Sequence, residues 1–265
     1  MFTKLRMFLG ITFCAFGATS NAQTPNANST SARTELTAQD RLAASTSLYK
    51  SIRTYCDNGL LTQEFSIQGR QIKSEMPFRT AFERGGRFRW QFRHSATPGA
   101  KSDQLFAIWS SDSKSFDSFW TLNSKRQTGQ KLDTSLASAT GISGGAATAI
   151  IPLLQIDKDG SAWGMMTTDL LKPEDDGQEE VDKVKCWKIK GKAKFGDTKI
   201  SLWIDGEGLI RKIDTETVVD PSKLPDAVSK NISKTPVFTT YTTITFKPVI
   251  NETKIDDSKF VQEDK

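Results

Sequence analysis

The sequence predicts an α+β protein that is mainly antiparallel β, with helices covering one face of a single curled sheet. Apolar and polar side chains alternate with a period of two residues in many segments between residues 60 and 250. The segments 37–55 and 131–155 lack this alternation and have helical character. No longer repeat is visible, which argues against a propeller or a solenoid. Because an antiparallel sheet of about 9–11 strands must curl, we expect helices to cover its apolar face.

The first 22 residues are predicted to be a secretory signal peptide. Lys4 and Arg6 precede an apolar run over residues 7–18, which is too short to span a bilayer. Ser20-Asn21-Ala22 places small residues at the positions that signal peptidase reads. We therefore expect cleavage after Ala22 and export of the mature chain.

A leader and one domain make up the remainder. Residues 23–36 are small or polar and have no periodicity, which predicts a disordered leader, and residues 37–265 are expected to form a single domain. The formal charge of the whole chain is +5 at pH 7, and Lys4 and Arg6 leave with the signal peptide. The charge that remains is too small to indicate nucleic acid as a partner.

An amphipathic helix is predicted at the start of the domain. Apolar side chains recur at helical spacing between Leu42 and Ile52, and Thr37 or Asp40 can cap the first turn. The polar group Asp57-Asn58-Gly59 is expected to close this segment with a turn.

Three half-buried strands are predicted next, within residues 61–68, 72–83 and 87–93. Turns that contain glycine separate them, so they are expected to form an antiparallel meander. One face of this meander is unusually aromatic, with Phe65, Phe78, Phe82, Phe88, Trp90 and Phe92. Such a face fits either a plain core or an apolar ligand site.

Residues 131–155 interrupt the strands. They are rich in Ala, Ser and Leu, poor in charge, and broken by Gly144-Gly145 and Pro152, which predicts two short apolar helices. Further strands are predicted at 105–111, 114–120, 181–194, 198–219 and 237–250, with a hairpin turn at 205–208.

Two cysteines remain after the signal peptide, Cys56 and Cys186. An even pair in an exported chain is more often a disulfide than two separate thiols, so we expect a Cys56–Cys186 bridge.

Gly141-Ile142-Ser143-Gly144-Gly145 fits the G-x-S-x-G pattern of a serine nucleophile. The residues before it read as helix rather than strand, and His94, the sole histidine, precedes it in the chain. A glycine break between two helices is the better interpretation. No catalytic residue, metal site or cofactor is expected.

A basic row alternates with the aromatic residues of the meander, and it contains Arg79, Arg84, Arg87, Arg89 and Arg93. Such a row can bind a polyanion or an anionic lipid surface. The neighbouring Glu75 and Glu83 favour the polar face of a solvated strand instead.

The segment "RGGRFRWQF" followed by "FAIWSSDSKSFDSFW" resembles the LolA/LolB-like lipoprotein carriers of the Gram-negative envelope. Arg84, Phe88 and Trp90 hold the spacing of the family's motif, and Ser111-Asp112 and Trp120 match its second part. Gly85 stands where the family usually has proline, and Ser113 stands where it has glycine. The order of elements is similar over most of the mature chain.

This resemblance implies an unclosed half-barrel whose concave face binds acyl chains beneath a mid-chain helical lid. Arg84 is then the latch that bonds to helix carbonyls, and Gly141, Gly144 and Gly145 are where the lid bends. The expected ligand-binding residues are Phe65, Phe78, Phe82, Phe88, Trp90, Phe92, Leu153 and Leu154.

The resemblance also implies a periplasmic monomer without enzymatic activity. Its expected ligands are lipids or the acyl chains of lipoproteins, and envelope membrane proteins are a further class of partner. The alternative is a structural or interaction module of the same fold whose own side chains fill the cavity. A serine hydrolase is the third hypothesis.

Overall fold

One antiparallel sheet holds all the strands that the computed structural model describes. The described residues are 35–67, 70–94, 104–140, 143–154, 170–194, 197–220, 237–251 and 255–260. The predicted signal peptide and most of the predicted leader therefore lie outside them. Leu36–Lys265 form one unit, to which all the elements below belong.

The first half of the sheet is a meander of β1 (Thr54–Ile67), β2 (Arg70–Glu83), β3 (Phe88–His94), β4 (Gln104–Ser110), β5 (Phe116–Trp120) and β6 (Lys125–Gln130). The second half contains β7 (Leu170–Val181), β8 (Val184–Ala193), β9 (Thr198–Asp205), β10 (Ile210–Val219), β11 (Phe238–Thr245) and the short β12 (Val249–Ile250).

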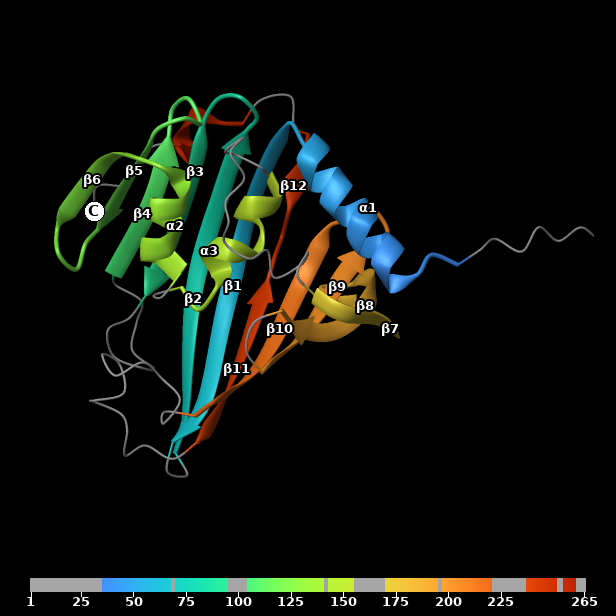
Figure 1. Cartoon of the computed structure of the whole chain (residues 1–265). Coiled ribbons are helices and arrows are strands. Elements are labelled where there is room, and N and C mark those ends of the chain that lie inside the picture. Colours follow the sequence, from blue (N-terminus) through green and yellow to red (C-terminus); the bar gives the residue numbers. More distant parts are fainter. Residues whose placement is uncertain are drawn as a thin grey trace, which may run out of the picture. The chain divides into compact units, whose positions relative to one another are not determined.

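The two halves join where β1 pairs with β11, in the order β6-β5-β4-β3-β2-β1-β11-β10-β9-β8-β7. β12 also pairs with β1. β6 and β7 are the two edges, and they do not pair with each other, so the sheet is unclosed (Figure 1). The predicted fold class, a curved and unclosed antiparallel sheet with helices, is confirmed.

The longest hairpin sets the register of the sheet. β1 and β2 pair over their full length, from Thr54↔Glu83 to Ile67↔Arg70. Gly59 lies opposite Phe78, and a Cβ at Gly59 would collide with the Phe78 ring. Glycine is therefore required at this position, because it lets an aromatic side chain lie flat over the strand.

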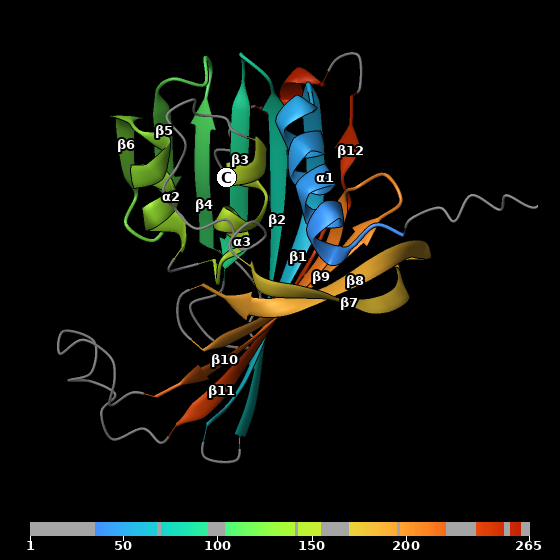
Figure 2. The same ribbon diagram turned by 45° about the vertical axis from the view of Figure 1, so that its right-hand side comes forward.

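Helices cover one face of this sheet, which we call the concave face (Figure 2). They are α1 (Ala38–Ser51), α2 (Leu132–Thr140), α3 (Ala146–Ala149) and the 3-10 turn η1 (Ile151–Leu154), while η3 (Asp257–Lys259) follows β12. Thr37 is the N-cap of α1 and forms a reciprocal capping box with Asp40, so the predicted helix is confirmed and Thr37 is the one of the two candidates that caps it.

The concave face and the helices share one continuous core. Side chains from α1, α2, α3 and η1 belong to the same buried cluster as those of the strands. A second, small cluster consists of Val181, Cys186 and Trp203. Among the described residues, no helix is both long and apolar enough to cross a membrane.

Candidate functional site: the helix-covered concave face

The floor of the candidate site is a layer of aromatic rings. Pairing places Phe78 opposite Phe92 and Phe82 opposite Phe88, so these side chains share one face with Trp90. All five are almost fully buried. Trp90 stacks on Phe92 with ring centroids 5.8 Å apart. The alternation in the sequence thus identified the residues of one face correctly.

More aromatic side chains join this floor than were named from the sequence. Phe106 meets Trp90 and Trp120 edge to face, and Phe116 meets Phe88 in the same way. Phe246, beyond the end of β11, packs edge to face against Phe78. The strands that hold Phe106, Phe116 and Trp120 were predicted, and their alternation could have identified these rings.

Phe65 lies apart from the other predicted ligand-binding residues. It pairs with Ile72 and Thr240, on the same face of the sheet but towards the far end of the long hairpin. Its side chain is half-buried and lies outside the main buried cluster.

The ceiling consists of α2, α3 and η1, which contribute small and apolar side chains. Leu153 and Leu154 are buried against the floor, as are Leu132 and Leu136 of α2. Asp133 of α2 is the one charged side chain in these three elements, and one of its carboxylate oxygens is buried. The ceiling is thus held on the floor mainly by apolar contact.

One polar tether fastens α2 to the edge of the sheet. The Ser135 hydroxyl donates to Gln130 Oε1 at 3.1 Å, and the Ser118 hydroxyl approaches the same atom at 3.4 Å. Ser118 lies on β5 and Gln130 on β6, so the tether connects the helix to two strands.

The break between α2 and α3 uses glycine for its backbone conformation. Gly144 and Gly145 have φ values of 54° and 94°, in the left-handed region that disfavours other residues. A Cβ on Gly144 would also press on Leu61, at 3.3 Å from its Cδ1. The predicted glycine break is confirmed at these two positions, whereas Gly141 lies outside the described residues.

Ser143 has a structural role in this break. It is buried, its hydroxyl accepts a hydrogen bond from the Ala147 amide at 3.3 Å, and its own amide donates to the Ala139 carbonyl at 2.9 Å. His94 lies at the end of β3, where Nδ1 is 3.2 Å from the Met76 sulfur. Through these two hydrogen bonds Ser143 connects the end of α2 to the start of α3.

Arg84, the predicted latch, bonds to a different helix from the one expected. Its Nε donates to the Ile52 carbonyl at 2.8 Å and its Nη2 to the Tyr49 carbonyl at 3.1 Å. These carbonyls end α1, where the helix dipole favours a cation. Partial burial lowers the pKa of Arg84. The guanidinium therefore caps the C-terminus of α1, which corrects its assignment as latch of the mid-chain helices.

The N-terminal half of α1 is fastened to the opposite half of the sheet. The Arg41 guanidinium lies 3.5 Å from the ring centroid of Trp187, and its Nε is 3.6 Å from an Asp175 carboxylate oxygen. Trp187 belongs to β8 and Asp175 to β7. Arg84, after β2, holds the other end. α1 thus spans two halves of the sheet, which no local pattern in the sequence indicated.

A buried polar cluster lies where α1 meets β1 and β10. The Tyr55 hydroxyl donates to Asp57 Oδ2 at 3.3 Å, and the Lys247 amide donates to Asp57 Oδ1 at 2.8 Å. Tyr49 accepts a hydrogen bond from the Ile210 amide. Burial raises the pKa of Asp57 to about 7.

This cluster corrects the predicted turn at Asp57-Asn58-Gly59. β1 begins at Thr54 and runs straight through these three residues. The Asp57 side chain supplies the acceptor for Lys247 in the gap between β11 and β12, where the chain does not continue the ladder. The polar residues that suggested a turn are therefore part of the strand, and Asp57 accepts a backbone hydrogen bond there.

The predicted disulfide is another correction. Cys56 and Cys186 are held as two separate thiols. Cys56 lies on β1 and Cys186 on β8, which are not neighbours in the sheet, and Cys186 packs in the small cluster with Val181 and Trp203. Burial raises the pKa of the Cys186 thiol to about 11. Within the described residues, no group of three or more His, Cys, Asp or Glu side chains is placed to hold a metal ion.

Comparisons with known proteins give similarity in structure but not in sequence. No family model matches the chain, and no curated protein matches it. Among solved structures, a LolA superfamily protein from Nitrosomonas europaea covers 86% of this chain and 99% of its own, with 11% identity and a TM-score of 0.29.

Two mycobacterial proteins are also similar in structure, again with low sequence identity. LprF from Mycobacterium bovis is 12% identical and covers 79% of this chain and 91% of its own, with a TM-score of 0.40. The lipoprotein LppX from Mycobacterium tuberculosis is 8% identical and covers 83% and 98%, with a TM-score of 0.40. Proteins of the LolA superfamily are thus among the solved structures that this chain resembles.

Proposed function

We propose that the chain is an exported, non-enzymatic binder or carrier of lipids or lipoprotein acyl chains, held between the aromatic floor and the mid-chain helices. The observation that carries this proposal is the composition of the two layers. The floor is a continuous aromatic surface, and the ceiling of α2, α3 and η1 opposes it with small and apolar side chains.

Separating the two layers would create an apolar slot that suits an acyl chain. Apart from Asp133 of α2, the side chains of the ceiling carry no charge, and the tether at Gln130 is its described polar connection to the sheet edge. An acyl chain that enters would replace the apolar contacts between ceiling and floor with apolar contacts of its own to each layer. Each buried CH₂ contributes roughly 0.8 kcal/mol, so one long chain gives useful affinity without any reactive group.

The chemistry of the site supports binding rather than catalysis. The Ser143 hydroxyl accepts a hydrogen bond from the Ala147 amide at the start of α3. The titratable groups with strongly raised pKa values, Tyr49, Tyr55 and Asp57, bond to one another or to backbone amides. They stabilise the junction of α1 with the sheet.

Native mass spectrometry of protein purified from its own cells tests the proposal. We expect a population with bound lipid, and we expect the delipidated protein to take up a fatty acid or an acylated peptide with one-to-one stoichiometry. A Trp90→Ala/Phe92→Ala variant should lose this uptake, whereas a Trp109→Ala variant on the opposite face should retain it.

Two other outcomes would point to the alternatives. If neither purified nor delipidated protein ever holds an acyl chain, the chain is a structural or interaction module with a filled interior. If a fluorophosphonate probe labels Ser143, the protein is a hydrolase.

A further inference from the structure

Two buried serine hydroxyls converge at the boundary between the aromatic floor and the ceiling. Ser118 lies on β5 two residues from Phe116 and two from Trp120, so its side chain is on the same face of the sheet as those rings. Ser135 lies on α2, in the ceiling. The exposed fractions of Ser118 and Ser135 are 3% and 0%. One hydrogen-bond donor from each layer is therefore buried beside the apolar contacts of the site.

The oxygen atom of a carbonyl group lies between these two hydroxyls. Gln130 Oε1 accepts a hydrogen bond from Ser135 Oγ at 3.1 Å and lies 3.4 Å from Ser118 Oγ. Hydrogen bonds between oxygen atoms are usually shorter, with an optimum at roughly 2.7–2.8 Å. The amide oxygen of Gln130 therefore fits the pair of donors loosely.

An irregularity of the edge strand directs the Gln130 side chain to this point. The pairing of β5 with β6 shifts by one residue between Ser118↔Gln127 and Phe116↔Gln130. Gly129, with a φ of 68°, lies in the shifted segment. Without the extra residue, Gly129 would lie opposite Phe116, and glycine has no side chain that can reach the serines. A bulge that re-aims one side chain in this way is typical of binding sites.

The other end of the Gln130 amide is directed to the surface. Its Nε2 donates to Gln127 Oε1 at 2.9 Å, and Gln127 is exposed. If the Gln130 side chain rotates away from the serines, its amide can form hydrogen bonds with water instead, so the net cost is small. The two buried hydroxyls would then need another acceptor.

We propose that Ser118 and Ser135 bind the carbonyl oxygen of an acyl ligand, and that the carbonyl oxygen of Gln130 occupies this place when no ligand is bound. The inference rests on the proposed function and specifies its ligand as a neutral acyl ester or amide. A neutral carbonyl matches two neutral donors and brings no charge into the site. The acyl tail then lies along the aromatic floor, and the ligand carbonyl bridges floor and ceiling.

Ligands that differ at the carbonyl group test the proposal. Delipidated protein is titrated with methyl dodecanoate, N-methyldodecanamide or dodecyl methyl ether, each of which displaces a bound fluorescent acyl methyl ester. We expect the ester and the amide to bind at least about fivefold more tightly than the ether, which has no carbonyl oxygen. In a slot without a donor the order would be reversed, because the carbonyl loses its hydrogen bonds to water there.

Two variants should move this preference in opposite directions. Ser118→Ala/Ser135→Ala removes both donors, so the ester and the amide should bind no more tightly than the ether. Gln130→Ala removes the competing oxygen, so the affinity for the ester and the amide should rise at least about threefold, while that for the ether changes by less than about twofold. A tether without a role in recognition would change all three affinities alike.

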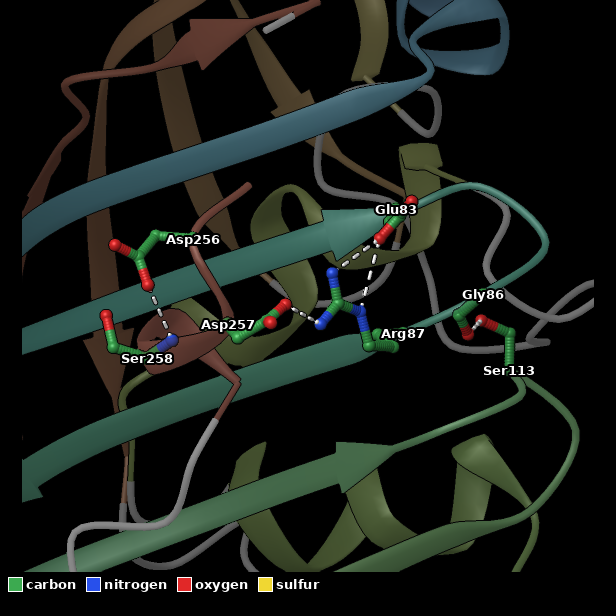
Figure 3. Close-up of polar contacts among 7 residues, drawn as sticks. All are labelled: Glu83, Gly86, Arg87, Ser113, Asp256, Asp257 and Ser258. Atoms are coloured by element: carbon green, nitrogen blue, oxygen red, sulfur yellow. Dashed lines mark hydrogen bonds and ion pairs between the residues drawn. The ribbon is translucent and has the colours of Figure 1, made fainter. Parts of the chain in front are cut away.

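Ser113→Ala is the matched control for the loss of a serine hydroxyl. The Ser113 hydroxyl donates to the Gly86 carbonyl at 2.6 Å, and it connects the turn after β4 to the turn after β2 (Figure 3). The control variant therefore also loses a hydroxyl that is bonded to a carbonyl, at the end of the sheet. It should keep the ester preference of the unaltered chain.

Infrared spectroscopy of an ester with an isotope-labelled carbonyl gives a second measurement. On binding to the unaltered chain, the C=O stretching band should lie at lower wavenumber than in an alkane solvent, because the carbonyl accepts hydrogen bonds. If Ser118→Ala/Ser135→Ala does not fold, which the unfolding midpoint shows, Gln130→Ala and this band still decide the question.

Equal affinities for the ester and the ether would overturn the inference, as would an ester preference that persists in Ser118→Ala/Ser135→Ala or a C=O band unchanged from that in alkane. In each of these cases the proposed function would stand, with a site that does not recognise the carbonyl. If none of the three ligands binds, the proposed function fails and this inference fails with it.

Discussion

At the scale of single residues, Asp57 is a buried acid whose pKa lies far above its ordinary range. Its carboxylate is desolvated in the core, and this raises its pKa from the ordinary 3.8 to about 7. A raised pKa means that the folded state holds a proton which the unfolded state has already lost between these two values. The contribution of Asp57 to stability is thus present at low pH and is lost as the pH rises towards 7.

Replacing Asp57 by Asn should abolish this dependence, because Asn keeps an acceptor for the Lys247 amide and does not titrate. The free energy of unfolding, from urea titrations between about pH 4.5 and pH 7.5, should fall relative to the variant by up to about 1.4 kcal/mol per pH unit. Asp112→Asn is the control, because hydrogen bonds from the Lys114 and Ser115 amides lower the pKa of Asp112 and its titration lies below this range. A constant difference between the unaltered chain and Asp57→Asn would refute the assignment.

At the scale of elements, α1 is held by side chains from two distant parts of the sheet, and Arg84 supplies the C-terminal cap. Arg84→Leu removes hydrogen bonds to the Tyr49 and Ile52 carbonyls, and we expect a loss of roughly 1–2 kcal/mol in the free energy of unfolding. Hydrogen exchange should rise in the last turn of α1. As a control, Arg126→Leu removes an arginine of the edge strand β6 that pairs with Asp117 of β5, and it should lower the free energy of unfolding only slightly.

Gly144 and Gly145 form the joint of the mid-chain helices. Alanine at either position must adopt a left-handed conformation, which costs roughly 1 kcal/mol per residue. We expect Gly144→Ala/Gly145→Ala to change the release rate of a bound fluorescent fatty acid by severalfold, followed by stopped-flow fluorescence. Gly177→Ala imposes the same backbone strain on β7, in open space, and should leave that rate unchanged. Equal effects of both changes would show that the joint has no special role in exchange.

At the scale of the whole molecule, local periodicity predicted which strand residues are buried on the concave face. It did not predict contacts between segments that are distant in the sequence. The alternation from Phe78 to Phe92 identified the concave face, because strand side chains point alternately to its two sides. The partner of Arg84 could not be predicted, since α1 reaches it only through tertiary packing.

The edge strands β6 and β7 were missed for a physical reason. An edge strand has solvent on one side and need not alternate. β7 has the acidic sequence LLKPEDDGQEEV with two register shifts, and β6 has an almost fully exposed KRQTGQ. Such segments resemble loops in composition, and only the hydrogen bonds of β8 and β5 make them strands.

The two-layer arrangement predicts which part of the molecule opens first. The strands β1, β2 and β3 pair with neighbours on both sides, whereas α2, α3 and η1 are short and, within the described part of the chain, rest on the floor through apolar contacts and the tether at Gln130. Amides of residues 132–140 and 146–154 should therefore exchange at least about tenfold faster with deuterium than those of β1–β3, under conditions where the chain stays folded. Bound fatty acid should slow exchange in the helices and leave β1–β3 unchanged. If helices and strands exchange together at the rate of global unfolding, the ceiling does not open separately, and an acyl chain would have to enter by another route.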